Sequence, residues 1–439
     1  MIPPILHRAP FRNFWLGQTI SVVGDQFTLL AIPIIAALLL GASPAEMGLL
    51  TAVGLLPHLL FSLPAGVWLD RVHRRRRLMI IVDLARAALI ATIPIAFVFG
   101  ALSLPQLYII TFLVGALAVV FDISWNTLFV AVTPRQDFVT ANSLLNGSRS
   151  LAYVLGPSIG GLLIQFLGAA TAMVADAFSY VASALFLGRV KAVEPPIEPA
   201  GASIREQLAT GLRFIARDPI MRPSLLSVAT VNLFNFAFHA LFILYVTTVL
   251  LVEPGLLGLA LGAGAVGGLL GALVAGRIGR RIGLGPAYAL GLIIFPASLI
   301  AIPLVQGSLP IVLLMLVLTE FGAGFGVMIL DISAGTIIQA RTPDSIRGRA
   351  NGAWRFVNYG IRPIGALMGG VLGTAIGVRE TLIVSTLLSL TGVLFLVGTP
   401  LLRLRDIPEQ AEGYGRRTDD TDAPEPGPSL PDDPGVAGT

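Results

Sequence analysis

The stretch GVWLDRVHRRRR, residues 66–77, places a compact charged turn between two long apolar segments. Residues 45–69 contain a single acid and no lysine or arginine, and residues 78–99 are apolar apart from Asp83 and Arg86. An apolar segment of about 20 residues has the length of a membrane-spanning helix. Short loops rich in arginine resist translocation, so we expect this turn on the cytoplasmic side of a membrane.

The composition points to the same class of protein. Hydrophobic residues occupy 55% of the 439 positions and charged residues 12%, whereas about a quarter of the residues in a soluble protein are charged. We therefore expect an integral membrane protein. The chain has no cysteine, which excludes disulfides and thiolate metal sites. Its net charge of +4 suits lipid-facing loops, and no nucleic-acid partner is expected.

Breaks at glycine, proline and charge clusters divide the chain into twelve predicted spans. They cover residues 14–40, 45–69, 78–99, 104–130, 139–167, 169–188, 223–251, 254–276, 285–306, 309–338, 350–377 and 379–402. Arginines collect in the tail and in the loops after the even-numbered spans, whereas the opposite loops contain only Arg379. We therefore expect both termini in the cytoplasm.

An internal repeat indicates how the spans are arranged. Residues 122–142 recur as residues 331–351, with nine of 21 positions identical and no gap. Because six spans separate the copies, both copies have the same orientation in the membrane, as in a parallel repeat. The predicted fold is an all-α integral membrane protein with twelve transmembrane helices in two pseudo-symmetric six-helix bundles. A substrate is then expected near the membrane midplane between the bundles.

The chain divides into four predicted parts: an N-terminal six-helix bundle (1–188), a cytoplasmic linker (189–222), a C-terminal six-helix bundle (223–402) and a disordered cytoplasmic tail (403–439). In the linker, Ile204, Leu208, Leu212 and Ile215 share one face of a predicted amphipathic helix. We expect that helix to lie at the membrane interface. The tail contains six prolines and shows no apolar period.

The charged turn resembles the signature loop between the second and third helices of the major facilitator superfamily of secondary transporters. Five residues match its GxxxDRxxRR spacing: Gly66, Asp70, Arg71, Arg74 and Arg75. His73 stands where that family usually has a second glycine. The resemblance implies that the loop takes part in conformational gating. The alternative is a topogenic basic loop with no gating role.

Two further segments resemble the twelve-helix drug:proton antiporter branch, which includes macrolide and enterobactin exporters. One is FWLGQTIS at residues 14–21, which leads to Asp25; the other is residues 122–142. The fifth span also matches the core of the motif associated with antiport, at Gly156, Pro157, Gly160 and Gly161. Small residues at this spacing also permit close helix packing, which is the structural alternative.

Ionisable residues within the spans are the candidate functional groups, because each costs about 2.5 to 3.5 kcal/mol at a helix centre. Asp25 lies mid-span in the first helix and Glu320 lies mid-span in the tenth. We interpret both as candidates for proton coupling or substrate recognition, with Arg362 as a cation that favours proton release. The alternative is an acid that is neutralised by a buried hydrogen bond. Asp83 and Arg86 are expected to pair locally on one helix.

A cytoplasmic gate is predicted from the repeat. Asp122 and Asp331 occupy equivalent positions, and each precedes a span with basic residues: Arg149 in the first half, and Arg355 and Arg362 in the second. The duplicated charge pairs indicate an interaction that forms and breaks during transport. Structural pairing that does not change during transport is the alternative.

The predicted function is therefore secondary active transport rather than enzymatic catalysis. The chain has no phosphate-binding GxxxxGK[ST] loop and no clustered metal-ligand spacing, so no cofactor and no metal are expected. We expect a monomer in a bacterial-type inner (plasma) membrane, with a small-molecule substrate, protons and the lipid bilayer as partners. Proton-coupled efflux of amphipathic compounds by alternating access is the leading interpretation. The alternatives are a proton-coupled uptake symporter and a non-pumping sensor or lipid-flipping protein.

The loop arginines generate a test of topology. Arg74→Cys introduces a single thiol into a chain without cysteine. An impermeant thiol reagent should label it in inside-out vesicles and not in intact cells, because the basic loop is expected in the cytoplasm. Labelling of intact cells would overturn the predicted topology.

Overall fold

A computed structural model describes residues 3–69, 74–191, 204–407 and 410–411, with side chains except at 62–69 and 204–205. The long helices are α1 (Ala9–Ile34), α2 (Pro44–Leu69), α3 (Arg75–Val98), α4 (Leu104–Val132), α5 (Phe138–Leu167), α6 (Ala169–Gly188), α7 (Ile204–Arg217), α8 (Met221–Thr248), α9 (Pro254–Ile282), α10 (Leu284–Leu299), α12 (Leu309–Arg341), α13 (Arg347–Ala375) and α14 (Val378–Leu390). Shorter helical turns are η1 (Pro4–His7), η2 (Ile35–Leu39), η3 (Arg135–Asp137), α11 (Ala301–Leu304), η4 (Asp344–Ile346), η5 (Thr391–Leu396) and η6 (Pro400–Arg403). The described residues contain no strand.

The helices agree with an all-α membrane fold. Eleven helices in the described part of the chain are long and apolar enough to cross a membrane. The twelfth, α13, has 29 residues, but it carries four arginines, which make it less apolar. Two predicted spans are interrupted: the span at 285–306 is divided between α10 and α11, and the last span continues from α14 into η5. The predicted twelve-helix fold is thus confirmed in its class and approximate helix count.

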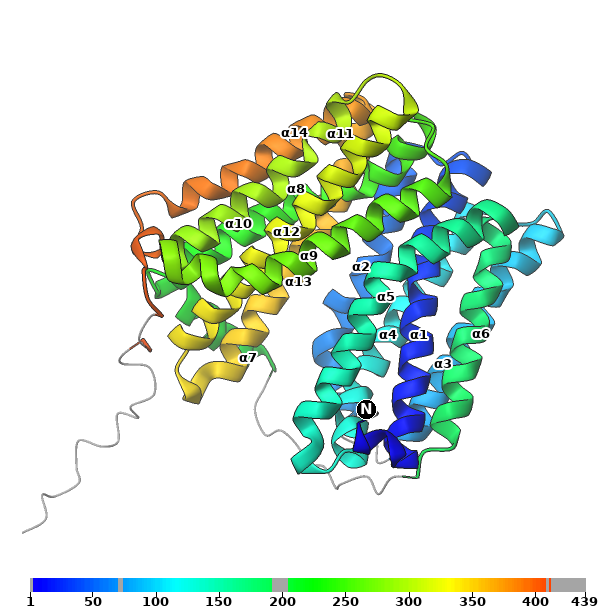
Figure 1. The fold of residues 1–439 in the computed structure, drawn as a ribbon, viewed down its shortest axis with the longest axis horizontal. Coiled ribbons are helices and arrows are strands. Elements are labelled where there is room, and N and C mark those ends of the chain that lie inside the picture. The colour runs from blue at the N-terminus through cyan, green and yellow to red at the C-terminus, as the bar shows by residue number, and fades with distance from the viewer. Residues whose placement is uncertain (1–2, 70–73, 192–203, 408–409, 412–439) are drawn as a thin grey trace, which may run out of the picture.

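The helices form two groups, α1–α6 and α8–α14, as Figure 1 shows. The groups converge at one end of the molecule and separate toward the end that holds the N-terminus (Figure 1). Between the groups, α5 packs against α9 and α2 packs against α13. These four helices therefore determine how closely the two groups approach each other.

Glycines allow the backbones to touch at both of these helix pairs. A Cβ atom at Gly161 of α5 would lie 3.0 Å from the Cα of Gly258 in α9. In the other pair, a Cβ atom at Gly370 of α13 would lie 3.0 Å from the Cα of Gly48 in α2. Gly370 follows Gly161 at the offset of the internal repeat. The two contacts are therefore pseudo-symmetric copies of one small-residue packing arrangement.

Two glycines nearer the other ends of α5 and α13 make no such contact. A Cβ atom at Gly147 in the first part of α5, or at Gly352 in the first part of α13, would meet no atom within 4 Å. The structure is therefore closed where Gly161 and Gly370 lie and open toward the end that holds the N-terminus. If that end is cytoplasmic, as the arginine distribution predicts, this conformation faces the cytoplasm.

The amphipathic helix α7 packs on protein. Phe214 and Ile215 of α7 are buried in one cluster with Ile338 of α12 and Ala353 of α13. Leu208 and Leu212 pack against the edge of that cluster. The ends of α12 and α13 therefore cover part of this apolar face, and the position of α7 at the membrane interface stays a prediction.

Asp218 holds the junction between α7 and α8. Its Oδ1 accepts hydrogen bonds from the backbone N–H groups of Ile220 and Met221, both at 2.9 Å. Its Oδ2 lies 2.9 Å from Nε of Arg341, at the end of α12. One buried carboxylate thus caps a helix and joins α7 to the second group of helices.

The glycine contacts predict a matched pair of effects. Gly161→Ala should destabilise the protein by about 1 to 3 kcal/mol, because its methyl group overlaps the Pro254 carbonyl oxygen and separates α5 from α9. Gly147→Ala, on the same helix but in open space, should be neutral or slightly stabilising. Thermal unfolding of the purified variants measures both effects. Equal melting temperatures for the two variants would contradict this account of the closed end.

Candidate functional site

A cluster of ionisable side chains is built from three helices of the first group. The hydroxyl of Tyr180 on α6 donates a hydrogen bond of 2.5 Å to Oδ1 of Asp25 on α1. Cζ of Arg86 on α3 lies 5.4 Å from the centre of the Tyr180 ring and 5.1 Å from that of Phe121. Arg86 is buried, and Asp25 is half-buried. The cluster therefore connects a buried guanidinium group with a partly exposed acidic residue.

Asp83 is the second acid of the cluster. Nη1 of Arg86 lies 3.9 Å from Oδ1 of Asp83, three residues away on α3, and both side chains are buried. This confirms the predicted local pair. The distance exceeds that of a hydrogen bond. The guanidinium of Arg86 therefore makes no hydrogen bond to Asp83, and it also lies over the ring of Tyr180.

Asp176 is a third acid, which the sequence analysis did not select. It lies on α6, one turn before Tyr180, and has no exposed surface. It accepts hydrogen bonds from the hydroxyls of Thr28 and Ser179, the second at 3.0 Å. A signal was present, because Asp176 is an acid within the predicted sixth span, and the criterion that selected Asp25 applies to it equally.

The charges of this cluster do not balance if every acid is ionised. Arg86 is the cation that acts electrostatically on all three carboxyl groups, Asp25, Asp83 and Asp176. Full ionisation would leave two uncompensated negative charges inside the helices, which is strongly unfavourable in a low-dielectric interior. The cluster is therefore suited to bind protons.

The predicted antiport motif packs directly beside Asp25. A Cβ atom at Gly156 of α5 would overlap the side chain of Gln26, and one at Gly160 would lie 3.0 Å from Cδ1 of Phe27. Gly161 faces α9 in the other half. The same turn of α5 thus contacts both the residues that follow Asp25 and the opposite group of helices.

The predicted gate residues of the first half lie near one another without forming an ion pair. Asp122 is exposed, and no ion pair joins it to Arg149 in the described structure. Arg149 places Cζ 4.7 Å from the centre of the Trp125 ring. A cation over the face of a tryptophan is a favourable contact. Arg149 is thus held by the residue one turn after Asp122.

In the second half, Arg362 of α13 lies between two aromatic rings. Its Cζ is 4.3 Å from the centre of the Tyr359 ring and 5.0 Å from that of Phe236 on α8. His58 of α2 stacks on Tyr359 with ring centres 6.3 Å apart. This stack crosses from one group of helices to the other, and the sequence analysis singled out neither Tyr359 nor Phe236.

The predicted gate of the second half consists of Asp331 with Arg355 and Arg362. The side chains of Asp331 and Arg355 are both exposed. Arg362 is the cation that acts electrostatically on Asp331, and no ion pair joins Asp331 to Arg355 among the described side chains. Of the two basic residues expected in this gate, Arg362 is therefore the one that acts on Asp331 in this conformation.

Glu320 is an isolated acid in the second half. Its side chain is 8% exposed, and Oε1 has no hydrogen-bond partner in the described structure. Gly264 of α9 packs closely against it, since a Cβ atom there would lie 3.2 Å from the carbonyl oxygen and 3.4 Å from Oε2 of Glu320. A buried acid without a partner is costly when ionised.

The basic turn is described in part. Asp70 and Arg71 lie outside the described residues, and Gly66 lies in α2 where side-chain surroundings are not described. Arg74 is exposed and precedes α3, whereas Arg75 is buried. Arg76 donates through Nη1 to the carbonyl oxygens of Gly188 at 3.1 Å and Val190 at 2.5 Å. The turn is thus attached to the C-terminal end of α6, where cations are favoured.

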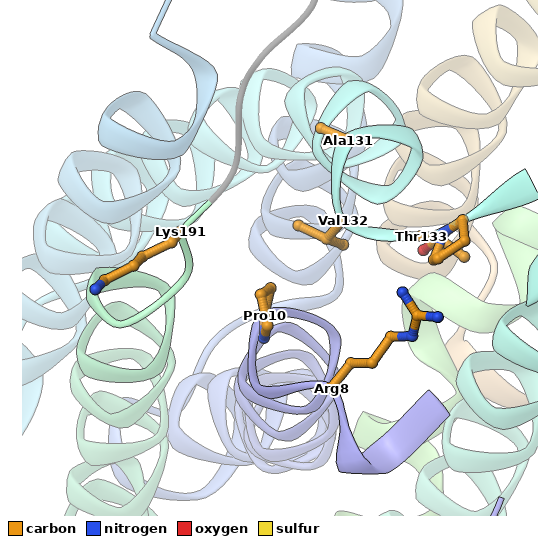
Figure 2. A pocket seen from close by; sticks show the side chains of 7 residues that line it. Arg8, Pro10, Ala131, Val132, Thr133 and Lys191 are labelled. Atoms are coloured by element: carbon orange, nitrogen blue, oxygen red, sulfur yellow. The ribbon is translucent and has the colours of Figure 1, made fainter. Parts of the chain in front are cut away.

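A separate pocket lies beside the N-terminus and is lined by Arg8, Pro10, Ala131, Val132, Thr133, Pro134 and Lys191. Figure 2 shows Arg8 extending toward Thr133 at the end of α4, whereas Lys191 extends away from it. None of the residues selected from the sequence lines this pocket. The charged clusters described above are the better candidates for function.

Two pseudo-symmetric helix groups, with ionisable groups between and within them, define a major facilitator transporter. Residues 3–413 match the family described as transmembrane secretion effectors, and the chain belongs to that family. It is a multi-pass membrane transporter of small molecules and not an enzyme.

Individual relatives extend over nearly the whole chain. The chain is 28% identical over 416 residues to the multidrug efflux pump Tap of Mycolicibacterium fortuitum, covering 91% of this chain and 97% of that one. It is 26% identical over 422 residues to the enterobactin exporter EntS of Escherichia coli, covering 92% and 95%. Among solved structures, a bacterial homologue of the iron transporter ferroportin in an inward-facing state has a TM-score of 0.71 at 19% identity, covering 89% and 98%. That last likeness concerns the fold.

The shared role of Arg86 can be tested by removing and restoring charge balance. Arg86→Gln should destabilise the protein by about 3 to 5 kcal/mol, because it leaves the buried acids without a cation. Adding Asp83→Asn to that variant should recover part of the loss. Arg277→Gln, an exposed arginine of α9, is the control and should have little effect. Thermal unfolding in detergent measures all three, and a double variant less stable than Arg86→Gln would contradict the argument.

Proposed function

We propose that this protein exports amphipathic small molecules in exchange for protons. The observation that carries the proposal is the position of Asp25, which joins the Arg86 cluster on one side and lies next to the residues that contact the antiport-motif glycines on the other. A change in protonation at Asp25 would act on the turn of α5 that also contacts the opposite bundle. Proton binding and bundle rearrangement could thus be linked by direct packing.

Relatives support the direction of transport. Proteins similar over nearly the whole chain are named a multidrug efflux pump and an enterobactin exporter. Export requires that the substrate enter from the cytoplasm. The open end of this conformation faces the cytoplasm if the basic loop, the linker at 189–222 and both termini are cytoplasmic, as we propose for a monomer in a bacterial inner membrane.

The two halves would have different tasks. Asp25 would couple transport to protons, whereas Glu320, buried without a partner, would recognise a cationic group on a substrate. Arg362 supports recognition of a planar or anionic group, because its guanidinium is already stacked between aromatic rings. Amphipathic compounds of either charge could then bind between the bundles.

Gating would use charges at the open end. We propose that Asp122, Arg149, Asp331 and Arg355, together with the Gly66, Asp70, Arg71, Arg74 and Arg75 loop, form contacts when that end closes. Their exposure in this conformation supports the proposal for Asp122, Asp331 and Arg355, since each is available for a new partner. Breaking and forming ion pairs would then accompany each transport cycle.

The proposal is tested in inside-out vesicles with an acidic interior. Wild-type protein should concentrate the dye ethidium, or another compound from a panel of antibiotics and siderophores, inside these vesicles. Asp25→Asn should abolish gradient-driven accumulation while retaining downhill exchange, because the neutral amide keeps the shape of the site and loses the titration. Asp344→Asn, which changes an exposed acid at the surface, is the control and should transport normally.

Three outcomes would contradict the proposal. Accumulation by Asp25→Asn with protons still released in step would remove Asp25 from coupling. Movement of substrate and protons in the same direction would favour the uptake symporter. No gradient-dependent movement of any compound, with lipid movement in its place, would favour the non-pumping alternative.

A further inference from the structure

Asp176 has surroundings unlike those of the other acids of its cluster. Its side chain is completely buried, and the hydroxyls of Thr28 and Ser179, which donate hydrogen bonds to it, are neutral. Gly24 brings α1 close to it, since a Cβ atom at Gly24 would overlap Oδ1 of Asp176 and Oγ of Ser179. The site is therefore tightly closed, and no cation among the described side chains is in direct contact with the carboxyl group.

Asp25 differs from Asp176 in its exposure. It is half-buried and accepts one hydrogen bond, from Tyr180, whereas Asp176 is completely buried. An ionised carboxylate is most costly where no solvent reaches it. Within this pair of acids, a negative charge is therefore less costly on Asp25, and Asp176 is the one better suited to hold a proton.

The other groups around Asp176 agree with this division. From α1 it faces Asp25, from α3 it faces the Arg86 that also serves Asp83, and on α6 itself Tyr180 lies one turn away. The charged groups that act on Asp176 are Asp25, which is repulsive when ionised, and Arg86. Charging Asp25 thus favours a proton on Asp176.

The residue that links α1 to Asp176 is Thr28. Thr28 lies three residues after Asp25, on the same face of the helix. Its hydroxyl contacts Oδ2 of Asp176. A hydroxyl is both a donor and an acceptor, so it can pass a proton along a hydrogen-bonded chain.

We propose that Asp176 stores the transported proton, and that Asp25 is the accessible group that passes the proton to it through the hydroxyl of Thr28. In this step the O–H bond of the Asp25 carboxyl breaks, and the Thr28 hydroxyl accepts that proton while giving its own to Asp176. Asp25 becomes a carboxylate beside Tyr180 and Arg86, and Asp176 becomes a neutral acid. This proposal rests on the proton coupling proposed above and adds a second residue to it.

The test uses the full-length protein in lipid without a substrate. Infrared difference spectroscopy during a change from alkaline to acidic pH detects the C=O stretch of protonated carboxyl groups. Asp176→Asn should lose one such band, whereas Asp25→Asn should retain that band. Retention of every carboxyl band by Asp176→Asn would overturn the storage role.

A second pair of variants tests the route and does not depend on the folding of Asp176→Asn. Thr28→Val keeps the shape of threonine and removes the hydroxyl, whereas Thr28→Ser keeps the hydroxyl. In heavy water, the Asp176 band should exchange its proton several-fold more slowly in Thr28→Val than in the wild type, and at the normal rate in Thr28→Ser. Equal exchange rates in both variants would overturn the route.

These measurements separate the two proposals. If the Asp176 band behaves as expected and wild-type vesicles transport nothing, the proton site stands and the exporter proposal fails. If wild-type vesicles exchange substrate for protons and the band is absent, coupling stands and Asp176 has no part in proton storage.

Discussion

The balance between one guanidinium and three acids, two of them completely buried, is the constraint on which the first half of this protein depends. The membrane interior offers no water to solvate charge, so Asp25, Asp83 and Asp176 require either Arg86 or a proton. This requirement brings α1, α3 and α6 together around a small number of polar contacts. It also makes the cluster sensitive to protonation, because each proton gained or lost changes how many negative charges the guanidinium of Arg86 must balance.

Packing of glycine against glycine links that cluster to the rest of the molecule. Gly156 and Gly160 of α5 contact the residues after Asp25, and Gly161 one residue later contacts Gly258 across the boundary between the halves. At Gly161 the backbones of α5 and α9 touch, so no flexible side chain lies between them to absorb a displacement. On the α1 side, α5 meets the side chains of Gln26 and Phe27, so the same part of α5 contacts both α1 and α9. The pseudo-symmetric contact of Gly370 with Gly48 has no comparable charged cluster behind it: in the described part of the second half, Glu320 is buried alone.

Much of the site could be predicted from local spacing and from the cost of burying charge. The pairing of Asp83 with Arg86 follows from their separation by three residues on a helix. Asp25 and Glu320 stand out because acids are rare in spans, and Asp176 could have been selected by the same criterion. Partners from other helices could not be predicted in this way. Arg149 lies over the ring of Trp125, and Arg362 lies close to the rings of Tyr359 and Phe236. Which aromatic ring a buried cation contacts depends on the rotation of the helices about their axes, and the sequence does not give that rotation.

The amino-acid sequence alone determined the membrane class, the approximate number of spans, the repeated halves and the motif glycines, because the length of apolar segments and the positions of arginine obey constraints that act locally along the chain. Tertiary structure decided which side chains contact the ionisable groups. It assigned Tyr180 to Asp25, Thr28 to Asp176 and the apolar face of α7 to α12 and α13. Such contacts join residues far apart in the chain, and they are set by helix rotation and close packing, for which the apolar pattern of a membrane helix carries little information.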